Sequence, residues 1–143
     1  MMRAVAGVVT TALAITTLTA CAGEDPYCVA VEEQKATLNS LGEKRTDAAY
    51  RSYARAFRSV AKVSPPAVKK DWTELAEVTA SVLNAQEKAD IKLEEMSDVE
   101  KVKKLSIEEL KSLNNAYEAF NKTSQQRRAV VKNVKQECEI TLA

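Results

Sequence analysis

The sequence predicts an all-α domain, organised as an antiparallel up-and-down four-helix bundle. Its apolar residues recur every three or four positions and do not alternate over any sustained stretch, which is the period of a helix. The 143 residues include three glycines and three prolines, and 29% are charged, a composition that favours long solvated helices over sheet. The positions of two cysteines, near opposite ends of the domain, select four helices over three.

The first two helices follow from their apolar stripes and from the residues at their ends. The first spans about 27–41 and is ended by Gly42; its stripe comprises Cys28, Val31, Leu38 and Leu41. The second spans about 47–63 after Thr46, whose side chain suits an N-cap. Its inner face comprises Ala49, Tyr50, Tyr53, Ala54, Phe57, Val60 and Ala61.

The third helix begins after the break at Ser64-Pro65-Pro66, because a residue before proline avoids helix and a proline suits the first helical position. It extends to about Leu93, and its inward residues are Val68, Trp72, Leu75, Ala76, Thr79, Val82, Leu83 and Ala89.

The fourth helix is preceded by two capping boxes, at Ser97 and Ser106, which predict a short helical piece and then a new start near Ile107. From there the helix either continues unbroken to about Ile140 or weakens at Thr123 and Ser124. Its stripe comprises Leu110, Leu113, Tyr117, Phe120, Val131, Val134 and Cys138.

The first 21 residues have the order of an export signal. Met1, Met2 and Arg3 form a cationic start, and the uncharged apolar run 4–17 is too short to remain in a bilayer comfortably. The small residues of Leu18-Thr19-Ala20-Cys21 suit a signal peptidase, whose groove admits small side chains before the cut. An ordinary secretory signal with a chance cysteine at the cut is the less economical alternative.

Leu18-Thr19-Ala20-Cys21 resembles the lipobox of bacterial lipoproteins. The resemblance implies that residues 1–20 are a cleaved lipoprotein signal peptide and that Cys21, its thiol acylated with palmitate-type chains, becomes the first residue of the mature protein. It also implies a location on the extracytoplasmic face of the cell membrane, with membrane lipid as the partner of Cys21. Two or more acyl chains make a stable anchor where one is marginal.

The mature chain divides into a short tether, residues 21–26, and a helical bundle domain, residues 27–143. Extended, the tether reaches roughly 20 Å, so the domain lies close to the bilayer and its partners are headgroups, membrane or envelope proteins, or soluble molecules that come to the surface. The domain is also similar to small helical lipoproteins of uncharacterised role in actinobacterial envelopes. This weaker resemblance depends on the early Cys28, on Ser64-Pro65-Pro66 followed by Lys70-Asp71-Trp72, and on Glu137-Cys138.

Composition excludes several function classes. Without residues 1–20 the chain carries 20 basic and 20 acidic side chains, because Arg3 is the single charge removed from 21 and 20, and this neutrality argues against nucleic-acid binding. The absence of histidine removes the commonest metal ligand and the usual proton-transfer group, and excludes serine-histidine and cysteine-histidine nucleophiles. We expect no enzyme activity, cofactor or metal, although a serine-lysine or carboxylate pair stays open.

Cys28 and Cys138 are expected to form a disulfide, because an exported chain meets an oxidising compartment and both residues lie on apolar stripes. Two buried free thiols are the alternative. Bonded cysteines have Cα atoms within about 7 Å, and the two ends of an up-and-down bundle meet only if the helix count is even. Four helices therefore satisfy the bridge and three do not.

Three surface or core features are further candidates. The first is a basic face on the second helix, Arg51, Arg55, Arg58 and Lys62, which lies about 140° from the apolar stripe. It suits anionic headgroups or polymers, although a solvated face or ion pairs with a neighbouring helix is the more economical interpretation. The second is an acidic cluster, a weak candidate for a calcium site, formed by Asp90, Glu94, Glu95 and Asp98. The third is an aromatic set that either lines a small-molecule pocket or fills the core: Trp72, Tyr50, Tyr53, Tyr117 and Phe120.

Two functional hypotheses remain. The first is a non-enzymatic binding or accessory module that presents a rigid surface to a membrane or envelope protein. The second is a small-ligand-binding lipoprotein with a pocket between its helices. A polar-lined cavity favours the second, and a filled core with one exposed apolar patch favours the first.

Overall fold

The computed structural model describes residues 23–143, which are all-α and contain no strand. Five helices have 14 to 23 residues: α1 Pro26–Asn39, α2 Asp47–Val63, α3 Pro66–Lys88, α5 Ile107–Asn121 and α6 Ser124–Cys138. A 3-10 turn, η1 Leu93–Glu95, and the four-residue α4 Val99–Val102 connect α3 to α5. The predicted lipobox, including Cys21, lies outside the described residues. No helix within 23–143 is long and apolar enough to span a bilayer.

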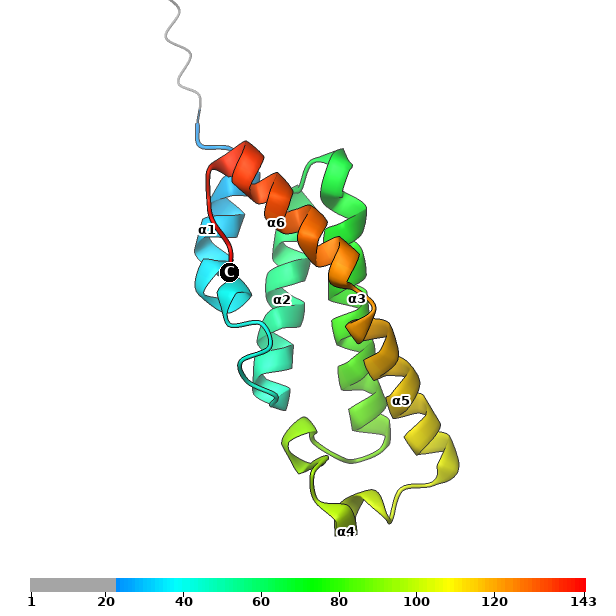
Figure 1. Ribbon diagram of the computed structural model, residues 1–143. Coiled ribbons are helices and arrows are strands. Elements are labelled where there is room, and N and C mark those ends of the chain that lie inside the picture. The colour runs from blue at the N-terminus through cyan, green and yellow to red at the C-terminus, as the bar shows by residue number, and fades with distance from the viewer. Residues whose placement is uncertain (1–22) are drawn as a thin grey trace, which may run out of the picture.

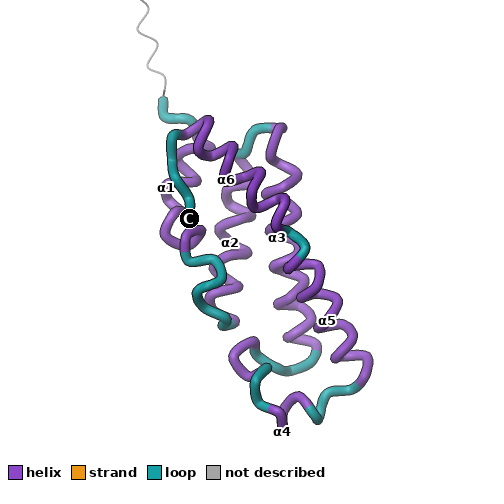
Figure 2. Tube along the Cα trace, in the orientation of Figure 1, coloured by secondary structure: helices purple, strands orange, loops and turns teal. Residues whose placement is uncertain are grey.

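The helices pack around α2 and α3. α2 lies between α1 and α3, while α5 and α6 follow one another along α3, and the end of α6 returns to α1 (Figure 1). The start of α1, the turn from α2 to α3 and the end of α6 lie at one end of the domain. The connection from α3 to α5 lies at the other end (Figures 1 and 2).

Helix starts follow local signals. The Asp25 side chain accepts a hydrogen bond from the Tyr27 N–H (2.8 Å) and caps α1, and Thr46 caps α2 through the Ala49 N–H (3.2 Å). Because Asp25 is held by this cap, only residues 22–24 link it to Cys21. Fully extended, this link spans roughly 14 Å, which is less than the reach of the predicted tether. α1 ends at Asn39, two residues before its predicted end, and Gly42 follows in a turn with φ 91°.

The end of α3 differs from the prediction. The helix ends at Lys88 instead of Leu93, because Asp90 adopts a left-handed backbone (φ 47°). The N–H of Ile91 then donates to the Gln86 carbonyl (3.2 Å) and the N–H of Asp90 to the Glu87 carbonyl (3.3 Å). These two bonds form a Schellman motif, in which the left-handed position is usually glycine.

The predicted fourth helix is two helices. At the break, the N–H and the hydroxyl of Thr123 both donate to the Phe120 carbonyl, at 3.3 and 2.7 Å, in place of the usual bond four residues back. α5 starts with the predicted capping box, in which Ser106 and Glu109 bond each other's backbone N–H. Leu110 was wrongly placed on the inner stripe, because it is 38% exposed.

The core lies mainly on α2 and α3, as their stripes predicted. Trp72, Val60 and Val82 have no exposed surface, and Leu113, Phe120 and Val134 close the core from α5 and α6. Ala49, Tyr117, Val131 and Cys138 are half-buried at its margin. The core is therefore centred on the α2–α3 pair, and the longest irregular connection is in residues 89–106.

Candidate functional site

Cys28 and Cys138 meet where α1 begins and α6 ends. Their Sγ atoms lie 2.02 Å apart, which is disulfide distance, and their Cα atoms lie 5.3 Å apart. Both side chains are half-buried against the core. The two cysteines therefore meet at the end of the domain where the chain arrives from residue 23 (Figure 1).

The predicted basic face is divided between two surroundings. Arg51 forms a long ion pair with Asp47 (3.9 Å), and Arg55 donates to the Ser52 hydroxyl (3.1 Å). Arg58 and Lys62 lie farther along α2, in a groove of about 470 Å³ whose α3 wall carries Lys69 and Glu77. Among residues 23–143, no acid lies within ion-pair distance of Arg55, Arg58 or Lys62.

The four acidic residues proposed for calcium serve other local roles. The Glu94 carboxylate accepts the Asp47 N–H (3.0 Å), and this bond lowers the pKa of Glu94. Glu95 pairs with Lys101 (2.5 Å), which lowers the pKa of Glu95, and Asp98 caps α4. Asp90 forms the end of α3. Within the described part of the chain, no three acidic or sulfur ligands gather in a metal-binding group, so these four residues do not come together as a calcium site requires.

A reciprocal pair of hydrogen bonds ties residues 89–98 to the start of α2. The Asp47 carboxylate accepts the Leu93 N–H (3.0 Å), and the Asp47 N–H donates to Glu94. The acidic Asp47 is favourable in the first turn of α2, where the helix N–H groups are unpaired. This tie separates two hollows, which we call the charged hollow and the aromatic hollow.

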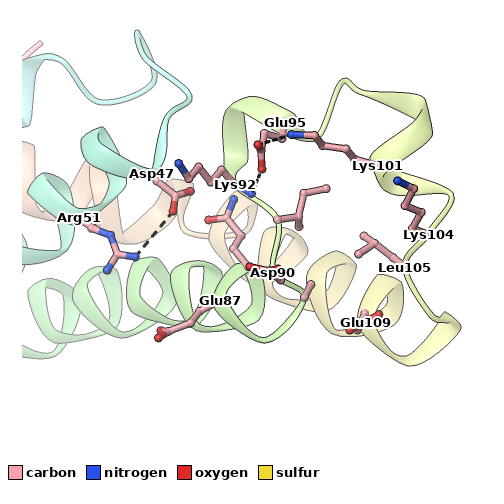
Figure 3. A pocket seen from close by; sticks show the side chains of 13 residues that line it. Asp47, Arg51, Glu87, Asp90, Lys92, Glu95, Lys101, Lys104, Leu105 and Glu109 are labelled. Carbon is pink, nitrogen blue, oxygen red and sulfur yellow. Dashed lines mark hydrogen bonds and ion pairs between the residues drawn. The ribbon is translucent and has the colours of Figure 1, made fainter.

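The charged hollow has a volume of about 640 Å³ and lies between α2, the end of α3 and residues 89–109. Figure 3 shows two ion pairs, Arg51 with Asp47 and Lys101 with Glu95, on either side of Lys92. Gln86 belongs to its wall and is 1% exposed, and neither its amide nitrogen nor its amide oxygen has a partner within residues 23–143. Its other lining residues include Glu87, Asp90, Lys104, Leu105 and Glu109.

The aromatic hollow has a volume of about 660 Å³ and lies where the start of α2, residues 93–97 and the α5–α6 junction meet. Its aromatic wall is Tyr50, Tyr117 and Phe120, and two arginines line it, Arg45 from the α1–α2 connection and Arg127 from α6. The other two members of the predicted aromatic set, Tyr53 and Trp72, are core residues with 2% and 0% exposure. The set therefore divides between a hollow and the core.

Electrostatics distinguish the two hollows. In the aromatic hollow, burial raises the pKa of Tyr117 to about 12, and the Tyr117 hydroxyl has no partner among the described residues. Burial also raises the pKa of Tyr50, whereas the positive charges of Arg45 and Arg127 lower it. Four cations and five anions line the charged hollow, whereas two cations and one anion line the aromatic hollow, which therefore has the excess of positive charge.

Sequence reasoning missed Gln86 and Arg127. Gln86 falls on the inner stripe of α3 beside Val82 and Leu83, so its polar character between apolar neighbours was an available signal. Arg127 lies over Phe120, seven residues earlier, and this spacing places the two on one face of a helix, which was also an available signal. Comparison of the chain with protein families, curated proteins and solved structures finds no match.

Proposed function

We propose that this protein is a lipid-anchored envelope protein, attached through Cys21, whose helical domain is a non-enzymatic binding module held close to the membrane surface. The observation that carries the proposal is Leu18-Thr19-Ala20-Cys21 followed within a few residues by a folded helix start at Asp25. A linker of roughly 14 Å cannot lift the domain far from the bilayer. The complete lack of histidine supports a non-enzymatic role.

The proposal includes the finer architecture. We treat α5 and α6 as one broken leg of an antiparallel up-and-down four-helix bundle, and the contacts of α3 with α2, α5 and α6 support this description. An even number of legs agrees with the meeting of Cys28 and Cys138.

The lipid anchor has a direct test. The full chain expressed in a bacterium should partition into detergent and carry acyl chains on Cys21, whereas Cys21→Ala should lose both properties. A Cys28→Ala, Cys138→Ala double variant is the matched control, because it alters cysteines without touching the lipobox. Mass spectrometry that finds unmodified Cys21 in membrane-free protein contradicts the anchor.

The position of the anchor implies which end of the domain faces the membrane. The turn from α2 to α3 lies at the same end as the start of α1, and beside it lie Arg58, Lys62 and Lys69. We propose that these side chains contact anionic headgroups, each contributing about 1 kcal/mol near such a surface. Acidic Glu77 in the same groove limits the gain, so this contact orients the domain and the acyl chains supply the attachment.

This orientation has its own test. The Cys21→Ala chain should bind anionic vesicles better than neutral ones, and the preference should fade with salt because the Debye length shrinks from about 10 Å at 0.1 M to 3 Å at 1 M. Changing Arg58, Lys62 and Lys69 to Gln should remove the preference. Changing Lys103, Lys104 and Lys111, toward the opposite end of the domain, should leave it intact. Equal losses in both triple variants contradict the orientation.

A small-ligand role is the second candidate. The observation that favours it is the pair of hollows, because the structure combines a tightly packed α2–α3 core with polar-lined spaces of small-molecule size. This role is compatible with the anchor, since a lipid-held domain samples soluble molecules at the surface.

A further inference from the structure

We propose that the aromatic hollow binds a small organic anion, a carboxylate carried on a flat apolar or aromatic body. The inference specifies the ligand class for the small-ligand role given above, and it does not depend on the lipid anchor. It follows from the size of the hollow, from two arginines that form no ion pair with a described acid, and from a buried hydroxyl that lacks a partner.

The hollow has the size and wall of a small-molecule site. Its volume of about 660 Å³ lies within the range of roughly 300 to 1,000 Å³ typical of ligand pockets. Tyr50 and Phe120 form a tilted pair with ring centroids 5.2 Å apart and 38° between their planes. Both are largely buried, so their positions are fixed before a ligand arrives. A flat apolar body can pack against this surface.

Two guanidinium groups serve the same small space. The Cζ atom of Arg127 lies 5.5 Å from the centroid of the Phe120 ring, a cation-π position that holds the charge beside the aromatic wall. Arg45 reaches the hollow from the α1–α2 connection. Both arginines lower the pKa of the Tyr50 hydroxyl against the effect of burial, so their charges converge on one group.

The two arginines outnumber the one acid of the hollow, Glu94, and neither is ion-paired with it. Neither Arg45 nor Arg127 has an ion-pair partner within residues 23–143. Glu94 lines the hollow, but its carboxylate accepts the Asp47 N–H at 3.0 Å and so holds residues 89–98 against α2. A carboxylate ligand can accept the two-pronged hydrogen bonds that arginine offers, and this geometry favours it over a neutral ligand.

The Tyr117 hydroxyl supplies the remaining polar contact. The oxygen is buried without a hydrogen-bond partner, although the ring belongs to the wall of the hollow. A tyrosine phenol is protonated at neutral pH, so the hydroxyl is a donor, and a bound anion is the acceptor that suits it. An unpaired buried donor costs free energy, so a ligand that accepts from it gains relative to water.

The test compares 2-naphthoate, its neutral amide 2-naphthamide, and acetate by titration calorimetry with the full chain. Naphthoate should bind, naphthamide should bind at least about tenfold more weakly, and acetate should show no saturable binding, because the site requires both charge and apolar body. Arg127→Gln and Arg45→Gln should each weaken naphthoate about tenfold. Arg128→Gln is the matched control, because Arg128 is the exposed neighbour that does not line the hollow.

Tyr117→Phe separates binding from folding. It keeps the ring but removes the hydroxyl, so naphthoate affinity should fall several-fold while the melting temperature of the free protein stays the same or rises. The inference is overturned if naphthoate does not bind, if it binds no better than naphthamide, or if Arg127→Gln and Arg128→Gln behave alike. Acylation of Cys21 is measured in a separate experiment, so a failure of the ligand proposal can be distinguished from a failure of the anchor proposal.

Discussion

The Tyr27 hydroxyl accepts a hydrogen bond from the indole N–H of Trp72, at 3.1 Å, inside the core. The same hydroxyl donates to the Asn133 side-chain oxygen at 2.9 Å, so one oxygen joins α1, α3 and α6. Tyr27 is 2% exposed and Trp72 is completely buried, so the bond between these two side chains is shielded from water, whereas the bond to Asn133 is part-buried.

Tyr27→Phe should therefore destabilise the domain. The change leaves the buried Trp72 N–H unpaired and removes the bond to Asn133, and we expect a loss of about 1 to 3 kcal/mol in the free energy of unfolding. Chemical denaturation followed by circular dichroism measures it. Tyr117→Phe is the control, because its hydroxyl has no partner to lose. Equal effects of the two changes contradict the three-helix junction.

The Cys28–Cys138 bridge should make a large contribution to stability. The bonded residues are 110 positions apart, and closing such a loop in the unfolded chain is worth roughly 4 to 5 kcal/mol in the chain-entropy model. Reduction should lower the melting temperature markedly, and the Cys28→Ala, Cys138→Ala variant should show the same loss without reductant. Alkylation of both thiols in native, unreduced protein refutes the bridge.

Gln86→Met should stabilise the domain. Methionine fills a similar volume without two buried polar atoms that lack partners, so we expect a gain of about 1 to 3 kcal/mol in the free energy of unfolding. Thr79→Val is the matched control on the same helix, because the Thr79 hydroxyl is buried but bonds the Leu75 carbonyl at 2.7 Å and should give no such gain. A loss of stability in Gln86→Met indicates that water or a ligand occupies the charged hollow and satisfies the amide.

Stability should decline in alkaline solution. Burial raises the pKa of Tyr27, Tyr50 and Tyr117, the last to about 12, whereas these residues ionise near pH 10 in the unfolded chain. Because the pKa of each tyrosine is higher in the folded state than in the unfolded state, its contribution to the free energy of unfolding is complete below pH 10. This contribution is lost as the pH rises toward 12. Denaturation midpoints measured across this range should fall, and Tyr117→Phe should reduce the slope. Identical slopes in both proteins contradict a buried Tyr117.

Periodicity predicted most of the helices, because α2 and α3 bury one continuous stripe each and begin at local signals, Thr46 and Pro66. The end of α3 could not be predicted from glycine usage, since Asp90 occupies the left-handed position. Likewise, the Thr123 break was visible as a weak polar stretch, but the two bonds from Thr123 to the Phe120 carbonyl that form it were not. The aromatic hollow combines segments from four parts of the chain, and no single window of sequence contains it.

The meeting of Cys28 and Cys138 also determines how the domain bears mechanical load. If the chain is anchored through Cys21 as proposed, a pull on the anchor enters the fold at Asp25 and reaches Cys28 three residues later. There the tension divides between α1 and α6, so the first turn of α1 cannot peel away without moving the end of α6 as well. In that proposed arrangement, the Cys28–Cys138 bridge would pass the load to two helices instead of one.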